Sequence, residues 1–329
     1  MIVSRTPLRV SFAGGGSDLA AFYEGRTGAV VTTAINKYIY VTINKKFDSK
    51  IRASYSATEI VDSLAQLKHE LIREGLGLAQ IRSGIEITSI SDVPSEGTGL
   101  GSSSSYTVGL MNALHAYVGR YAGAERLARE ACYIEIDRCG RPSGKQDAYI
   151  AAYGGLQYLQ FNSDGSVFAD PIICKPETRT RLQTHLLLLY TGITRPAGDV
   201  LREQRHNIEN DADRRETLSK MVALADGLRD ALCRDSLTDF GDILHQGWLL
   251  KKEMASQISN PRIDRWYKLA IDHGAQGGKV LGAGGGGFLM LYAPPERHEG
   301  IRAALPELRP VGFGFEAQGS KIIYVEEAM

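Results

Sequence analysis

The sequence lacks long hydrophobic runs and net charge. Its most apolar run, Leu186 to Tyr190, is far too short to cross a bilayer, and residues 1–20 have no basic region followed by a hydrophobic one. Lys plus Arg number 38 and Asp plus Glu also number 38, so no overall field attracts nucleic acid or an anionic membrane. We therefore expect a cytoplasmic protein without nucleic-acid or membrane partners. A homodimer is left open.

Cysteine is also scarce and unpatterned. The four cysteines, at positions 132, 139, 174 and 233, form no Cys-x-x-Cys and have no neighbouring histidine at ligand spacing. We expect reduced and mostly buried thiols. His69-Glu70 is not followed by a second histidine four residues after the first, which excludes the zinc-protease motif.

The length of 329 residues predicts two domains. A hydrophilic stretch holding Pro171 and Pro176 is the expected boundary, which gives domains of residues 1–175 and 176–329. Apolar patterns typical of strands and helices alternate irregularly along both halves. This irregularity favours two α+β domains over one doubly wound sheet.

The segment from Pro94 to Ser105 is a candidate phosphate-binding loop. Its glycines, at 97, 99 and 101, leave room for backbone N–H groups to converge on an anion, and its serines add hydroxyl donors. Ser102 or Ser103 is expected to cap the helix that follows, whose positive N-terminus favours phosphate. The alternative is an ordinary glycine-serine linker.

Two further loops carry charge beside flexible backbone. Residues 13–18 end a predicted strand with three glycines and Asp18, which either caps a short helix or accepts hydrogen bonds from substrate hydroxyls. Residues 141–147 form a turn-rich segment that carries Arg141, Lys145 and Asp147. Loops on a rigid scaffold are where chemistry is usually placed.

Neither common nucleotide motif fits. Gly282-x-Gly284-x-x-Gly287 satisfies the dinucleotide pattern, but it precedes a strand-like stretch in the last fifth of the chain rather than opening a helix. Gly144-Lys145 is followed by Gln146, so the Walker motif is absent.

Three separated features, taken in order, resemble the GHMP kinase superfamily. They are Arg9 with the glycines at 14–16, the loop from Pro94 to Ser105, and the segment from Lys279 to Phe288. The resemblance spans nearly the whole chain. It implies an N-terminal domain like that of ribosomal protein S5, a ferredoxin-like C-terminal domain, and both substrates in the cleft between them.

The resemblance also implies roles for individual residues. Asp147 would be the catalytic base with Arg9 facing it, and Ser103 and Glu135 would hold Mg²⁺ against the phosphates of ATP. Asp147 as a turn residue and Glu135 as a surface residue are the alternatives. The implied nucleotide-binding residues are Pro94, Gly97, Gly99, Leu100, Gly101, Ser102, Ser103 and Ser104. The implied substrate-binding residues are Gly15, Gly16, Ser17, Asp18, Gly284 and Gly285, with Lys145 and Arg195 either binding a substrate phosphate or remaining solvated.

Within the superfamily, residues 8–18 and 144–149 are most similar to kinases of D-glycero-D-manno-heptose 7-phosphate. These kinases phosphorylate the anomeric hydroxyl and give heptose 1,7-bisphosphate, on the route to nucleotide-activated heptose for lipopolysaccharide or capsule. Ala148 stands where those kinases usually have Gln. An anomeric kinase of a free sugar such as fucose or galactose is one alternative, and a non-catalytic nucleotide- or RNA-binding module is another.

Overall fold

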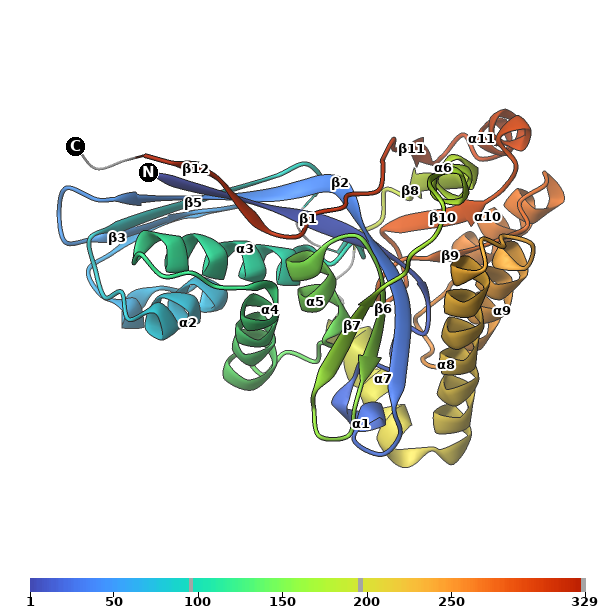
Figure 1. The fold of residues 1–329 in the computed structure, drawn as a ribbon, viewed down its shortest axis with the longest axis horizontal. Coiled ribbons are helices and arrows are strands. Elements are labelled where there is room, and N and C mark those ends of the chain that lie inside the picture. Colours follow the sequence, from blue (N-terminus) through green and yellow to red (C-terminus); the bar gives the residue numbers. More distant parts are fainter. Residues whose placement is uncertain (95–96, 195–197, 327–329) are drawn as a thin grey trace.

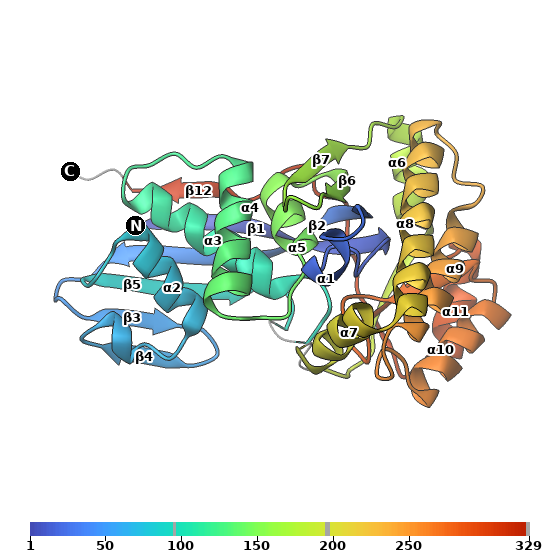
Figure 2. The ribbon, with the colours of Figure 1, turned by 90° about the horizontal axis from the view of Figure 1, so that it is seen from below.

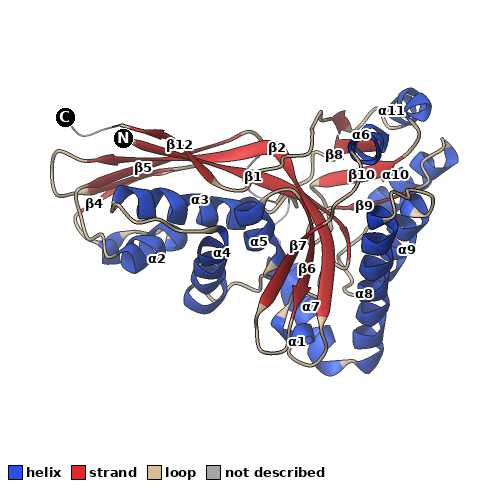
Figure 3. Ribbon diagram, in the orientation of Figure 1, coloured by secondary structure: helices blue, strands red, loops and turns tan. Residues whose placement is uncertain are grey.

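The computed structural model describes residues 1–94, 97–194 and 198–326. Its strands form two sheets (Figure 3). The larger sheet contains β1 (Ile2–Ala13), β2 (Gly28–Lys45), β3 (Ile51–Ser54), β4 (Thr58–Val61), β5 (Ile85–Ser91), β6 (Leu156–Phe161), β7 (Val167–Pro171) and β12 (Lys321–Val325). The smaller sheet contains β8 (Leu186–Tyr190), β9 (Gly277–Val280), β10 (Phe288–Tyr292) and β11 (Arg309–Pro310).

The larger sheet is organised around β1 and β2. These strands pair along almost their whole length, and β2 pairs with β6 through residues 28–33 and with β5 through residues 39–45. β2 is rich in β-branched and aromatic residues, which fit a pleated, largely buried surface. The pairing between β1 and β2 shifts register at Pro7 and again between Ser11 and Ala13. The second shift lies where β1 enters the loop of residues 14–18.

Helices cover one face of this sheet. α2 (Glu70–Ala79), α3 (Ser102–Tyr117), α4 (Ala124–Cys132) and α5 (Gln146–Tyr153) lie beneath it in Figure 1 and across it in Figure 2. α3 packs against both β1 and β2. Its residues are buried nearly all round, as expected of a helix between a sheet and further helices.

The smaller sheet has the order β11-β8-β10-β9 with every pair antiparallel. Between β8 and β9 run α7 (Gly198–Asn210), α8 (Ala212–Cys233), α9 (Phe240–Glu253) and α10 (Pro261–Asp272), and between β10 and β11 runs α11 (His298–Ala304). If the helices between β8 and β9 are counted as one, the order of elements is strand–helix–strand–strand–helix–strand, which is the ferredoxin-like topology. α6 (Pro176–His185) precedes β8, and the remaining short helices are α1 (Ala20–Tyr23), η1 (Leu64–Gln66), η2 (Tyr133–Arg138) and η3 (Pro295–Arg297).

The side chains of β8 alternate between two hydrophobic cores and so link the two halves of the molecule. Leu186 and Leu188 belong to the large core under the first sheet, whereas Leu187 and Leu189 belong to a second core with α8, α9 and α10. Successive strand residues point to opposite faces, so a continuously apolar strand is buried on both. The division at residue 175 stays a prediction, and β12 returns from the C-terminal half to pair with β1.

In several places the structure differs from what the local sequence suggests. The apolar residues from 60 to 72 recur at helical spacing, but β4, η1 and α2 occupy this stretch. The alternating residues at 311–316 are spaced as in a strand, but they make only an isolated bridge between Ile35 and Phe315, directly after β11. All four cysteines are free, but only Cys132 is fully buried, so the thiols are less buried than expected. Within the described residues, no helix is both long and apolar enough to cross a membrane.

Candidate active site

One cleft of about 480 Å³ collects most of the predicted site residues. Its walls come from β1, the loop before α3, the loop before α5, α7, α9 and the glycine segment before β10. The predicted residues that line it are Arg9, Gly15, Gly16, Asp18, Gly97, Gly99, Gly101, Ser102, Ser103, Ser104, Asp147 and Gly284. Residues far apart in sequence thus share one cavity.

The loop before α3 reaches the helix through glycine. Gly101 is the N-cap residue with a φ of 77°, a left-handed conformation that favours glycine, and no side chain caps the helix. The predicted serine cap is therefore wrong. Among the described residues, the first-turn N–H groups of α3 have no side-chain acceptor at the wall of the cleft.

The side chains of Ser103 and Ser104, in the first turn of α3, form hydrogen bonds with Glu135 instead. Ser104 Oγ donates to Glu135 Oε2 at 2.5 Å, and Ser103 Oγ donates to Oε1 of the same carboxylate. Arg141 Nη1 donates to Ser103 Oγ at 2.7 Å. Glu135 is buried on η2, the π-helical turn that continues α4, and burial raises the pKa of its carboxyl while the two serine hydroxyls lower it. A carboxylate and two hydroxyls therefore meet at the helix N-terminus.

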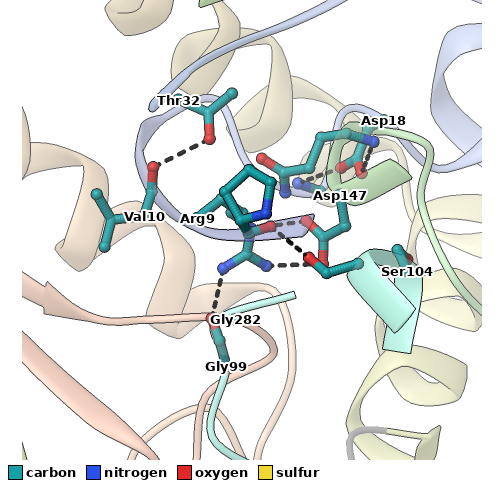
Figure 4. Close-up of polar contacts among 12 residues, drawn as sticks. Arg9, Val10, Asp18, Thr32, Gly99, Ser104, Asp147 and Gly282 are labelled. Atoms are coloured by element: carbon teal, nitrogen blue, oxygen red, sulfur yellow. Dashed lines mark hydrogen bonds and ion pairs between the residues drawn. The ribbon is translucent and has the colours of Figure 1, made fainter. Parts of the chain in front are cut away.

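Asp147 and Arg9 form a bidentate ion pair (Figure 4). Arg9 Nε lies 2.7 Å from Asp147 Oδ1 and Arg9 Nη2 lies 2.8 Å from Asp147 Oδ2, while Arg9 Nη1 donates to the carbonyl of Gly99. The Arg9 side chain is almost fully buried, but the Asp147 side chain is 23% exposed, so the carboxylate remains accessible from the cleft. The pair fixes both oxygens of Asp147 beside the glycine-serine loop.

Asp18 lies on the same side of the cleft. Its carboxylate accepts hydrogen bonds from the N–H of Gly16 at 3.0 Å and of Gln146 at 3.2 Å. Burial raises the pKa of Asp18, and the nearby charge of Asp147 raises it further. A Cβ at position 144 would collide with this carboxylate, so Gly144 permits the loop before α5 to close on Asp18.

The glycine segment before β10 packs directly on the loop before α3. A Cβ on Gly282 would collide with Gly99, and one on Gly287 would collide with the carbonyl of Thr98. Both glycines also have left-handed φ angles, of 72° and 82°. The two glycine segments therefore form a single backbone platform.

The remaining predicted residues are not among those that line the cleft. Leu100 is buried in the core, and Ser17 Oγ donates to the carbonyls of Gly14 and Ala29. Lys145 Nζ donates to the carbonyl of Gly165 at 2.5 Å and lies 4.6 Å from the centroid of the Tyr23 ring. Pro94 and Gly285 also lie outside the lining, and Arg195 lies outside the described residues.

Sequence reasoning missed several polar residues of the cleft. Three have a buried side-chain atom without a hydrogen-bond partner in the described structure: Ser11 Oγ, Gln146 Oε1 and Gln204 Nε2. Two are buried lysines, Lys251 on α9 and Lys279 on β9. Alternation along β1 puts Ser11 on the same face as Arg9, Gln146 lies in the candidate loop of residues 141–147, and Lys279 opens the third segment of the family resemblance, so these three had a signal in the sequence.

Family models match both halves of the chain. The model described as GHMP kinases N terminal domain matches residues 60–155, and the one described as GHMP kinases C terminal matches residues 228–310. The chain is 30% identical to a D-glycero-alpha-D-manno-heptose 7-phosphate kinase of Campylobacter jejuni, over 97% of this chain and 98% of that protein. It is 25% identical to a bifunctional fucokinase/GDP-fucose pyrophosphorylase of Arabidopsis thaliana, over 92% of this chain but only 31% of that protein.

A solved structure extends the likeness to the whole fold. The crystal structure of a D-glycero-D-manno-heptose 1-phosphate kinase from Bacteroides thetaiotaomicron superposes with a TM-score of 0.82 at 26% identity, covering 99% of this chain and 100% of that one. The predicted two-domain α+β fold and the predicted phosphotransferase class, with an alcohol group as acceptor, are confirmed. GHMP kinases use ATP as a substrate. The chain belongs to the GHMP kinase family.

Proposed function

We propose that the protein transfers the γ-phosphoryl group of ATP to the anomeric hydroxyl of D-glycero-D-manno-heptose 7-phosphate. The product, heptose 1,7-bisphosphate, would serve the synthesis of nucleotide-activated heptose. The observation that carries the proposal is the bidentate contact between Arg9 and Asp147, at 2.7 and 2.8 Å, in the same cleft as the glycine-serine loop. The C. jejuni relative, named as a kinase of this sugar phosphate, supports the choice of acceptor.

The nucleotide would bind at the loop before α3. The uncapped first-turn N–H groups and the helix dipole favour the phosphates. The proposed nucleotide contacts are Gly97, Gly99, Gly101, Ser102, Ser103 and Ser104, all of which line the cleft. Phosphoryl transfer depends mainly on alignment and charge neutralisation, which such a loop supplies.

The residues present fit a magnesium ion that accompanies ATP. Ser103 and Glu135 offer a hydroxyl and a carboxylate oxygen, both hard ligands, and Mg²⁺ commonly binds through one or two such groups plus phosphates. Within the described residues, no cluster of three or more His, Cys, Asp or Glu forms a dedicated metal cage. When bound, the ion would offset negative charge on the phosphates.

The acceptor would bind between Asp147 and Asp18. Asp147 would accept the proton of the anomeric hydroxyl or orient that hydroxyl. Because an anomeric hydroxyl is more acidic than other sugar hydroxyls, orientation would be the larger contribution. Asp18 and the unpartnered polar atoms of Ser11, Gln146 and Gln204 offer donors and acceptors for the remaining hydroxyls. Buried polar atoms without partners are costly, and a polyhydroxylated ligand would satisfy them.

The test is an ADP-release assay with MgATP and a panel of heptose 7-phosphate, free heptose, mannose, fucose and galactose. Turnover selective for heptose 7-phosphate, with a new anomeric phosphate signal in the phosphorus NMR spectrum of the product, is expected. Preference for a free sugar would overturn the proposed acceptor and leave a kinase. A new phosphate at another carbon would overturn the proposed position of transfer.

A further inference from the structure

Among the residues that the structure describes, five cationic side chains line the cleft, and three of them are already paired with carboxylates. Arg9 is paired with Asp147, Arg141 lies 3.9 Å from Glu135 and close to Ser103, and Arg202 is paired with Asp199. The other two are Lys251 and Lys279, which form no ion pair with any described residue. These two are available to a ligand.

Both lysines are deeply buried. Lys251 is 6% exposed and Lys279 is 4% exposed. Lys251 Nζ donates to the carbonyl of Gly282, and Lys279 Nζ donates to the carbonyl of Phe12 at 3.3 Å. An ammonium group has three donors, so most of the donors of each lysine have no protein acceptor among the described residues. Burial lowers the pKa of Lys251 to about 8 and that of Lys279 well below its usual value.

A buried cation without an anionic partner is unfavourable unless a ligand supplies the partner. The two lysines lie near one another and near Arg9: the charge of Lys251 lowers the pKa of Lys279, and the charge of Arg9 lowers the pKa of both. The carboxylates of Asp18 and Asp147 are near enough to raise the pKa of Lys251. Lys251 comes from α9 and Lys279 from β9 of the smaller sheet. A dianionic group held between them would receive several charge-assisted hydrogen bonds.

The contact of Lys279 with β1 lies where the phosphate end of a bound sugar phosphate would be expected. The N–H of Arg9 donates to the carbonyl of Leu100 in the nucleotide loop, whereas Lys279 contacts Phe12, three residues further along the strand. Three residues of strand correspond to about 10 Å. An acceptor with its anomeric hydroxyl at Asp147 would extend along this strand, away from the nucleotide loop and towards Lys279, with Lys251 beside it at Gly282.

We propose that Lys251 and Lys279 bind the phosphate that the acceptor sugar already carries and thereby select a phosphorylated sugar over a free one. This inference rests on the proposed function and names the residues that would give it specificity. The two lysines take the place of Lys145 as the proposed source of positive charge for that phosphate, because Lys145 is not among the residues that line the cleft and its ammonium also lies against the Tyr23 ring.

The test compares kcat/KM for heptose 7-phosphate and for the same heptose without phosphate. Lys279→Met and Lys251→Met are expected to lose roughly 10- to 100-fold on the phosphorylated sugar, the range of one or two charge-assisted contacts, and less than threefold on the free sugar. The matched control is Lys252→Met, next in sequence on α9 but partly exposed and 3.3 Å from Asp264, which should leave both values unchanged. Equal losses on both sugars would overturn the proposal, because they would place the lysines on the transferred phosphate.

A second measurement keeps the inference separate from the proposed substrate. Inorganic phosphate, added to protein saturated with Mg²⁺ and a non-hydrolysable ATP analogue, is expected to raise the Tm of the wild type but not that of Lys279→Met. If the wild type prefers free heptose yet shows this phosphate response, the proposed substrate is wrong and the anion site stands. If the wild type shows no phosphate response, the inference is wrong. Lys279→Gln replaces Lys279→Met in both assays should the methionine variant fail to fold.

Discussion

Single residues at the centre of the cleft are held by contacts that come from distant parts of the chain. Asp147 is fixed by Arg9, a residue on the first strand, and Arg9 is fixed in turn by the carbonyl of Gly99. Glu135 is held by two hydroxyls from the first turn of α3. Each of these side chains has its direction set before a ligand arrives, which is the condition for efficient phosphoryl transfer.

Asp147→Asn keeps the shape of this side chain and removes its charge and its basicity. We expect kcat to fall by about 100-fold or more, the usual contribution of a positioned base. Circular dichroism and Tm should show a folded protein. Asp62→Asn, which changes an exposed aspartate outside the cleft, serves as the control. A kcat within threefold of the wild type would remove Asp147 from the mechanism.

Lys251 gives a prediction for stability against pH. Its pKa is lowered by burial from 10.5 to about 8, so the native state binds this proton less tightly than the unfolded state. The resulting penalty is fully present below pH 8 and disappears as the pH rises from about 8 to 10.5. Without ligands, Lys251→Met should therefore be more stable than the wild type at pH 7, by about 1–3 kcal/mol.

The measurement is denaturant unfolding of both proteins between pH 7 and 10. The difference in the free energy of unfolding should shrink as the pH rises. A variant that is less stable than the wild type at pH 7 would show that Lys251 already has a good partner in the unliganded protein.

Helices, strands and loops position these residues, and the sequence predicts some of these elements but not others. The loop before α3, the helix itself and β8 could be predicted, because glycine spacing and apolar runs are local signals. α5 was not predicted, because the helix is short and its apolar residues, three of them alanines, follow one another without a clear stripe, although Asp147 lies in its first turn. The apolar residues at 60–72 resembled a helix, but pairing of β4 with β3 took precedence over local periodicity.

The difference between local sequence signals and long-range packing also explains which site residues the sequence could reveal. Asp18, Ser103 and Asp147 stand near glycines or turns, and Arg9 belongs to a segment of the family resemblance, so their place in the cleft could be predicted. Their roles stay predictions. Lys251 stands next to Lys252 in the last turn of α9, and nothing in the sequence separates them. Only the packing of α9 against β9 and the glycine segment buries one lysine and leaves the other partly exposed.

The platform formed by the two glycine segments gives a prediction at this scale. Gly282→Ala should raise the KM for ATP by about tenfold or more, because its Cβ would displace Gly99 in the nucleotide loop. Gly119→Ala is the matched control, since Gly119 has a similar φ of 70° but no atom within 4 Å of the added Cβ. Both variants bear the same backbone strain of about 1 kcal/mol, and only one moves the loop.

The measurement is steady-state kinetics at saturating sugar together with Tm. Similar ATP KM values for the two variants would show that the glycine segment before β10 does not support nucleotide binding.

The whole molecule places the cleft where its two sheets meet. The larger sheet contributes Arg9 and Ser11 from β1, and the smaller sheet contributes Lys279 from β9. Lys251 comes from α9, the second helix before β9 in the chain. The shared burial of β8 on both faces joins the two cores firmly. We therefore place the nucleotide on the side of the larger sheet and the distal phosphate of the acceptor beside Lys279 of the smaller one.

A crystal structure with heptose 7-phosphate and a non-hydrolysable ATP analogue tests this account most directly. We expect the γ-phosphate beside Ser103, the anomeric oxygen within hydrogen-bonding distance of Asp147, and the sugar phosphate in contact with Lys251 and Lys279. A sugar bound in the opposite direction, with its phosphate at Arg141 and its anomeric oxygen away from Asp147, would contradict it.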